Sequence, residues 1–305
     1  MVVDDVLTLQ TEGLAPLRAP VMIVALHGLF DMASAATTAV AGMISGDTIT
    51  VGEIDPDPFF DFTQERPMVE IDEGELRIIR WPDSRFDVVR GDGAHDLVLA
   101  VGTEPHLHWA TYAQCVIAVS RRLGCEAVLT VGSTAEALPH TRMPTVTGST
   151  TNDELAKRLG LAAPSYQGVT GLVGVLHAEL EHAGIPSISL RVGIPHYLVN
   201  AEHPTAVAAL QAHIGHVVGI NIAADHRDDI DRWRQLHDEV VEGDPQLGLY
   251  VRMLEQEYDR RAEEAIPSAD DLGAEFEQFL RAHRDDDRPD DPDDERLGDP
   301  DDPPG

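Results

Sequence analysis

The chain has 305 residues, with 54 acidic side chains against 22 lysines and arginines, a formal net charge of −32 and 43% hydrophobic content. A surface this acidic repels nucleic-acid phosphates and anionic lipid headgroups, so neither is expected as a partner. No apolar run approaches the roughly 18 residues of a membrane span, and residues 1–5 do not resemble the start of a signal peptide. We therefore expect a cytoplasmic protein.

Short apolar runs rich in valine and isoleucine recur along the chain, separated by helical patterns. The runs are Val21–Leu26, Leu97–Val101, Ala127–Val131 and Ile188–Val192. Each is apolar almost throughout rather than at alternate positions, which is typical of strands covered by helices on both faces. The sequence therefore predicts an α/β fold.

Helical spacing and end signals locate three helices within this pattern. We expect helices over Thr111–Leu123 before Gly124, over the residues from a Thr151 capping box to Gly160, and over Val173–Ala183 before Gly184. Between Ile49 and Val89 no helical period appears. The turn residues Asp72–Glu75 predict a hairpin or meander there, at an edge of the sheet or in a small lobe.

The character of the sequence changes after Ala224. Two apolar helical stripes follow, one beginning after Asp244-Pro245 and one at Ser268. Residues 285–305 contain eleven acids and two arginines, too little apolar surface to offset the entropy of ordering. We predict an α/β core domain over residues 1–224, a C-terminal helical extension over 225–284 and a disordered acidic tail over 285–305.

Polar residues follow the ends of the predicted strands. The carboxyl ends of parallel strands form one edge of a sheet, where α/β proteins bind ligands. Histidines, hydroxyls, glycines and one arginine on this edge are compatible with a cleft for an anion or small ligand, but equally with ordinary turn chemistry. The candidate ligand-binding residues are His27, Asp31, Glu104, Ser133, His140, Arg142, Thr147, Gly148, Thr170, Gly171, His196 and Tyr197.

Complete catalytic motifs are missing from the sequence. It contains no G-x-S-x-G elbow, G-x-G-x-x-G loop or Walker loop, and Glu104-Pro105-His106-Leu107-His108 lacks a separated further metal ligand. Cys115 and Cys125 have no metal-ligand spacing and are expected to be small core residues. We therefore predict no catalytic residue, metal or cofactor.

Several separated motifs, in this order, resemble the proteasome assembly chaperone two family over about residues 7–225. They are Asp55–Phe62, Arg66-Pro67, Gly102–Pro105, Leu138–Arg142, Val146–Gly148, Gly168–Gly171 and Ile194–Tyr197. Leu254–Asp259 and Pro267–Leu272 with Phe279–Arg281 are similar to the helical extension of actinobacterial members. The resemblance implies a single three-layer domain with a mixed central sheet, similar to the purine nucleoside phosphorylase fold, and no enzymatic activity.

Relatives in eukaryotes act as chaperones of proteasome ring assembly, so the resemblance implies a chaperone-like interaction protein. Members that dock on proteasome rings are expected to end in a hydrophobic residue, a tyrosine and one more residue, whereas this sequence reads Asp302-Pro303-Pro304-Gly305. We expect homo-oligomers and proteasome-related partners. The alternative is a small-ligand binding protein or an enzyme of nucleoside or carboxylate metabolism that uses the polar edge, although a phosphate site would require more basic groups than Arg142.

Overall fold

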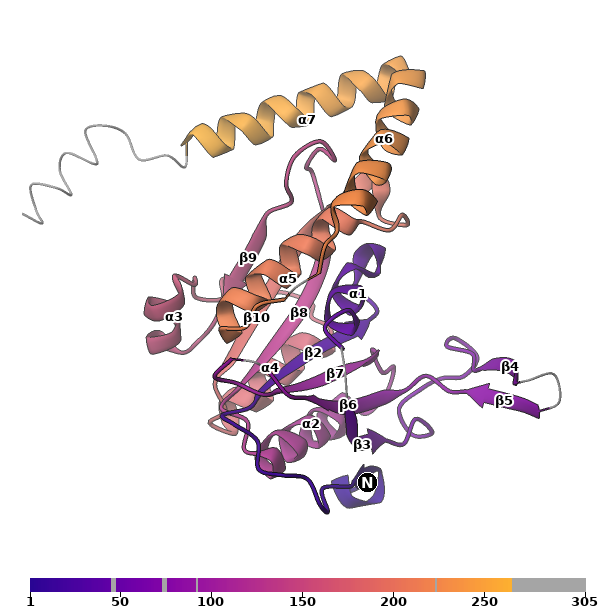
Figure 1. The fold of residues 1–305 in the computed structure, drawn as a ribbon, viewed down its shortest axis with the longest axis vertical. Coiled ribbons are helices and arrows are strands. Elements are labelled where there is room, and N and C mark those ends of the chain that lie inside the picture. Colours follow the sequence, from indigo (N-terminus) through magenta and orange to yellow (C-terminus); the bar gives the residue numbers. More distant parts are fainter. Residues whose placement is uncertain (45–47, 73–75, 92, 223, 265–305) are drawn as a thin grey trace, which may run out of the picture. The chain divides into compact units, whose positions relative to one another are not determined.

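The computed structural model describes residues 1–44, 48–72, 76–91, 93–222 and 224–264 (Figure 1). An eight-stranded mixed sheet lies at its centre. In spatial order the strands are β1 (Leu7–Leu9), β3 (Ile49–Ile54), β6 (Ser84–Val89), β7 (Leu97–Thr103), β2 (Val21–His27), β8 (Ala127–Glu136), β10 (Ser187–Pro195) and β9 (Val146–Ser149). The central strands β7, β2, β8 and β10 are parallel, and the outer ones pair antiparallel. The predicted α/β class and mixed sheet are confirmed.

Helices cover both faces of the sheet, which explains why its strands are apolar throughout. The helices α2 (Trp109–Leu123) and α4 (Leu172–His182) pack on one face, and α1 (Ala35–Ala41) and α5 (Pro204–Val218) on the other. In β2, Met22 and Val24 belong to the first core, whereas Ile23 belongs to the second. Alternate residues of one strand therefore fill two separate cores.

The predicted helices form with small differences at their ends. The helix α2 ends at Gly124, which has a left-handed φ of 69°. The helix α3 (Asp153–Leu159) is capped by Asn152, whose side chain accepts the amides of Glu154 and Leu155 at 3.1 and 3.0 Å. The predicted Thr151 cap is therefore wrong by one residue, because the asparagine oxygen already occupies these free amides. The helices α1 and α5 were not predicted.

The region without helical period contributes to two sheets. Its outer strands, β3 and β6, join the main sheet, whereas β4 (Met68–Asp72) and β5 (Leu76–Arg80) pair with each other in a separate hairpin. Both predicted alternatives, a sheet edge and a small lobe, are therefore present in this region. Short 3-10 helices lie at Val3–Asp5 (η1), Met32–Ser34 (η2) and His196–Leu198 (η3).

Two helices follow α5, namely α6 (Arg227–Gly243) and α7 (Pro245–Glu264). The start of α7 is the predicted one, and Asp244 accepts the amides of Gln246 and Leu247 there. The helix α6 was not predicted, and Trp233 is its only buried residue. One compact unit runs from Met1 to Glu255 and a second begins at Gln256.

The second predicted extension helix, from Ser268, and the acidic tail lie outside the described residues. The predicted domain division stays a prediction. Among the residues that the structure describes, no helix has the length and apolar character that a membrane span requires.

Candidate functional site

Glu104, at the end of β7, is held by backbone amides from two other elements. Its Oε2 accepts the Leu29 amide at 3.1 Å and its Oε1 accepts the Leu172 amide at 2.8 Å, at the start of α4. Gly28 and Gly171 allow this approach, because a Cβ on either would lie 2.7 or 2.8 Å from a Glu104 oxygen. The carboxylate thus connects the loop after β2 to α4.

Thr170 and Gly171, two further candidates, lie beside this carboxylate at the start of α4. Gly171 is the N-cap residue of α4, and Thr170 Oγ1 donates to the Gly171 carbonyl oxygen at 3.4 Å. Both residues therefore shape the helix start that Glu104 caps.

Asp31 and Ser133 tie the ends of β2 and β8 to the start of α1. Buried Asp31 accepts the amides of Ala36 and Thr37 at 2.9 and 3.2 Å and the Thr37 hydroxyl at 2.6 Å. Ser133 Oγ donates to the Met32 carbonyl at 2.8 Å. His27 Nδ1 lies 3.2 Å from Asp31 Oδ2, but its side chain is 59% exposed. Of these three side chains, only that of His27 has much of its surface available to a ligand.

A pocket of about 480 Å³ opens beside Glu104. His27, Thr103, Glu104, His106 and Trp109 contribute to its lining. Several of their polar atoms have internal partners, since Trp109 Nε1 donates to the Pro105 carbonyl and His106 Nδ1 accepts the Asp61 amide at 3.1 Å. This pocket combines two of the twelve candidate residues, His27 and Glu104.

The candidates His140 and Tyr197 lie elsewhere, beneath α6. Tyr197 Oη accepts the His140 amide and contacts His140 Nδ1, both at 2.8 Å. On the other side of the ring, His140 Nε2 lies 3.2 Å from Asp238 Oδ1 on α6. Burial lowers the pKa of His140, although Asp238 opposes the effect, and burial raises the pKa of Tyr197 to about 12. The pair connects the chain after β8 to α6 through Asp238.

His196 and Arg142 face α7 in the same region of the first unit. His196 Nε2 lies 2.9 Å from the Tyr250 hydroxyl, and its Nδ1 lies 3.2 Å from the Glu136 carbonyl oxygen. Arg142 pairs with Glu255 at 3.4 Å. The arginine expected to anchor an anion is thus engaged by a carboxylate of the chain itself.

The remaining candidates, Thr147 and Gly148, belong to β9 at the edge of the sheet. They line a third pocket, of about 220 Å³. The strands β7 and β10 are separated by β2 and β8. At about 4.8 Å per strand these two strands lie about 14 Å apart, so Glu104 after β7 and His196 after β10 do not share one site. Whether any of the twelve candidates binds a ligand stays a prediction.

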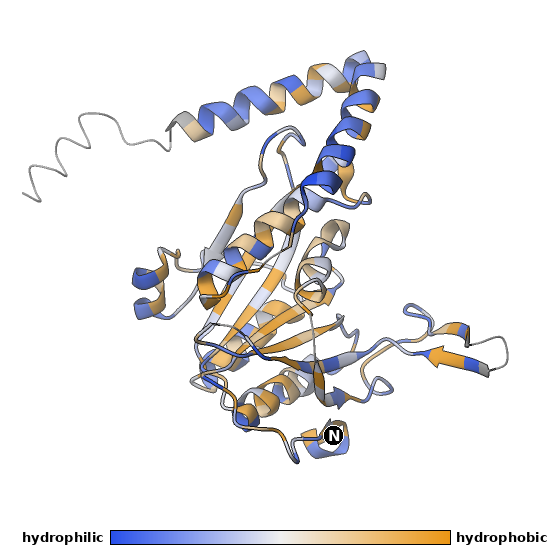
Figure 2. Ribbon diagram, viewed as in Figure 1, coloured by the Kyte–Doolittle hydropathy of each residue, from blue (hydrophilic) through white to orange (hydrophobic). Residues whose placement is uncertain are grey.

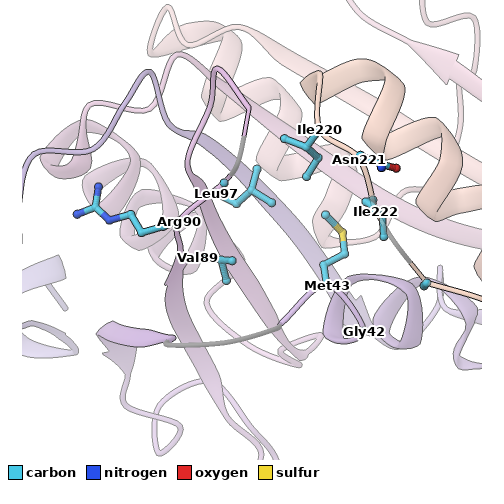
Figure 3. A pocket seen from close by; sticks show the side chains of 10 residues that line it. Gly42, Met43, Val89, Arg90, Leu97, Ile220, Asn221 and Ile222 are labelled. Atoms are coloured by element: carbon cyan, nitrogen blue, oxygen red, sulfur yellow. The ribbon is translucent and has the colours of Figure 1, made fainter.

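An apolar pocket of about 460 Å³ lies at the opposite ends of the parallel strands (Figure 3). Met43, Val89, Leu97 and Ile222 contribute to its lining. Figure 3 shows Arg90 pointing away from these side chains, and its guanidinium binds Asp96 at 2.8 Å. The residues next in sequence, 45–47, 92 and 223, are outside the described part, and we assign no ligand to this pocket.

Comparisons with known proteins agree with the fold and motifs. The model of the PAC2 family matches residues 25–241. This chain belongs to the PAC2 family. The predicted resemblance to proteasome assembly chaperones is thereby confirmed.

Solved structures of other proteins are similar to this chain over most of their length. A PAC2 family protein from Streptomyces avermitilis is 33% identical with a TM-score of 0.70, covering 76% of this chain and 99% of the other. A proteasome-assembly chaperone homologue from Mycobacterium tuberculosis is 30% identical with a TM-score of 0.69, again covering 76% and 99%. An archaeal proteasome activator from Pyrococcus furiosus, 16% identical with a TM-score of 0.60 over 78% and 98%, shares the fold. No curated protein matches.

Two residues that pack at the candidate sites of this PAC2 protein, Trp233 and Arg191, were not identified from the sequence. Trp233 stacks on His203 and His237 with ring centroids 4.3 Å apart in each case. Arg191 lies in the third pocket over the Phe30 ring. A tryptophan in a charged helix and an arginine inside an apolar strand are the signals that could have identified them, because both residue types are unusual in those places.

Proposed function

We propose that this PAC2 protein is a non-enzymatic, chaperone-like interaction protein of the cytoplasm that contacts proteasome-related proteins. Its 30% identity to a proteasome-assembly chaperone homologue supports the kind of partner. The internal hydrogen bonds of Glu104, Asp31 and Tyr197 support a role other than catalysis, because these groups serve to position backbone and helices.

The observation that carries this proposal is the apolar face of the β4–β5 hairpin. Strand alternation places Val69, Ile71 and Ile79 on one face, with exposed fractions of 60, 68 and 46%. Figure 2 shows hydrophobic residues on both strands. The other face contains the ion pair between Arg80 and Glu70 at 3.0 Å. Arg77, opposite Ile71, is a cation on the same face and is also exposed. Three exposed apolar side chains beside one cation on a hairpin are typical of a protein contact surface, and we assign it to a proteasome-related partner.

The test mixes the purified chain with purified proteasome subunits from the same source. We expect a complex and faster ring assembly in analytical ultracentrifugation. Val69→Asp with Ile71→Asp should weaken the complex at least tenfold, because two charges would be placed within an apolar contact. Met68→Asp is the matched control, since Met68 is similarly exposed at 67% but lies on the opposite face.

Two results would contradict the proposal. One is the absence of any complex or effect on assembly with the unmodified chain. The other is equal binding by the double variant, which would remove the hairpin from the contact. Homo-oligomers are a separate part of the proposal, and light scattering that finds a monomer at micromolar concentration would end it.

A further inference from the structure

The pocket at the β9 edge contains an arginine without an acidic partner. Arg191 is partly buried there, and among the described residues no carboxylate forms an ion pair or hydrogen bond with its guanidinium. Acids outnumber lysines and arginines by 54 to 22 in the sequence, so a shortage of carboxylates does not explain this. Burying part of a charged guanidinium group costs free energy, because the group loses hydrogen bonds to water, unless a partner replaces those hydrogen bonds.

Strand pairing gives the pocket its polar floor. Arg191 lies opposite Thr147, and Ser189 lies opposite Ser149, all on the same face of the sheet. On its other side, Arg191 lies opposite Gly132. A Cβ on Gly132 would lie 3.1 Å from the Phe30 carbonyl oxygen, so the glycine leaves room for Phe30.

Phe30 contacts the guanidinium group of Arg191. The Arg191 Cζ atom lies over the Phe30 ring, 5.2 Å from its centre, as in a cation–π contact. A cation–π contact uses none of the guanidinium N–H groups as hydrogen-bond donors to an oxygen, and two of these donors match two oxygens of a carboxylate or phosphate.

Hydroxyl groups line the same pocket as Arg191. Thr147, Ser149, Ser165 and Ser189 line the pocket, and none of their hydroxyls hydrogen-bonds another described residue. Each can donate one hydrogen bond to an anion oxygen. The volume of about 220 Å³ suits a small molecule rather than a macromolecule.

We propose that this pocket binds a small oxyanion, a carboxylate or phosphate, through the guanidinium group of Arg191 and the hydroxyls of β9 and β10. The site goes beyond the proposed chaperone role and does not depend on it. It also differs from the anion site expected at Arg142, because Glu255 already occupies that guanidinium at 3.4 Å.

The test follows the Nε–H signal of Arg191 by NMR in the full ¹⁵N-labelled chain. The signal is identified by its absence in Arg191→Gln. Inorganic phosphate and acetate are titrated separately, with sodium chloride keeping the ionic strength constant. We expect at least one probe to shift this signal to saturation. A signal that neither probe moves to saturation, or saturation at Arg142 instead, overturns the proposal.

Variants provide an independent readout by thermal shift. Arg191→Gln should abolish the anion-dependent rise in Tm, while Arg85→Gln, on β6 at the other side of the sheet, should retain it. Thr147→Val removes a hydroxyl without changing the arginine and should weaken binding about fivefold. A rise in Tm that persists unchanged in both pocket variants would contradict the proposed site.

Discussion

The carboxylate of Glu104 accepts the backbone amide of Leu172 at 2.8 Å, so the first turn of α4 is capped by the side chain that directly follows β7. The same carboxylate accepts the Leu29 amide at 3.1 Å. Two segments distant in sequence therefore depend on one acidic group at the end of the sheet.

Glu104→Gln should reduce the free energy of unfolding by about 2 kcal/mol, because charge-assisted hydrogen bonds are lost and an amide group meets backbone donors. Urea unfolding at pH 7 measures the loss. Glu126→Gln is the control, since Glu126 is exposed before β8 and should change stability by less than about 0.5 kcal/mol. Equal stabilities of the two variants would show that Glu104 does not hold α4.

Asp96→Asn should cost about 3 kcal/mol, because the fully buried Asp96 side chain binds Arg18 at 3.0 Å and Arg90 at 2.8 Å. Burial would raise the pKa of Asp96, but hydrogen bonds from the Arg18 amide, the two arginine side chains and the Gly91 amide lower it to about 2. Its stabilisation is therefore complete above about pH 4 and is lost as the pH falls to about 2.

Urea unfolding at pH 4.5 and 2.5 tests this pH dependence for Asp96. The unmodified chain should lose about 2 kcal/mol more than Asp96→Asn over this interval. Asp57→Asn, on an exposed residue, should behave like the unmodified chain. If Asp96→Asn lost as much as the unmodified chain, the ion pairs would not explain the acid sensitivity.

We expect His203 to cause a second loss of folding stability, at a higher pH than the loss caused by Asp96. Burial lowers the pKa of His203 to about 4, and its Nε2 has no hydrogen-bond partner among the described residues. A histidine with a lowered folded-state pKa stabilises the fold fully above about pH 6.5 and progressively less as the pH falls to 4. Between pH 7.5 and pH 5 this residue should account for a loss of about 2 kcal/mol.

The variant His203→Asn isolates this effect, because asparagine can still cap α5 but does not titrate. Its loss of stability between pH 7.5 and pH 5 in urea should be about 2 kcal/mol smaller than that of the unmodified chain. His182→Asn, on an exposed histidine at the end of α4, should leave the pH dependence unchanged. An identical pH dependence in all three proteins would contradict the assignment.

Truncation after Arg284 should leave Tm within a few degrees, because residues 285–305 are predicted from sequence to be disordered. Circular dichroism recorded during heating measures the Tm of the truncated and the full chain. A fall of more than about ten degrees would mean that the tail packs on the folded part.

The sequence by itself determined the α/β class and the positions of the central strands. The run from Val21 to Leu26 is apolar throughout because its alternate residues fill cores on the two sides of one sheet. Local signals also defined the C-terminal end of α2 and the start of α7, since Gly124 and Asp244 act on backbone groups within a few residues. Such features depend on neighbours in sequence, and they can be inferred without tertiary contacts.

Only the tertiary structure decided how the polar strand ends are used. Glu104 and Arg142 both follow predicted strands, but one is engaged by backbone amides of the loop after β2 and of the start of α4, and the other by Glu255, more than a hundred residues away. Arg191 was overlooked within an apolar strand, since its surroundings depend on the pairing of β10 with β9 and on Phe30 from a distant loop. Residue type and spacing specify which groups can bind a ligand, but strand order and long-range packing determine which of them remain available.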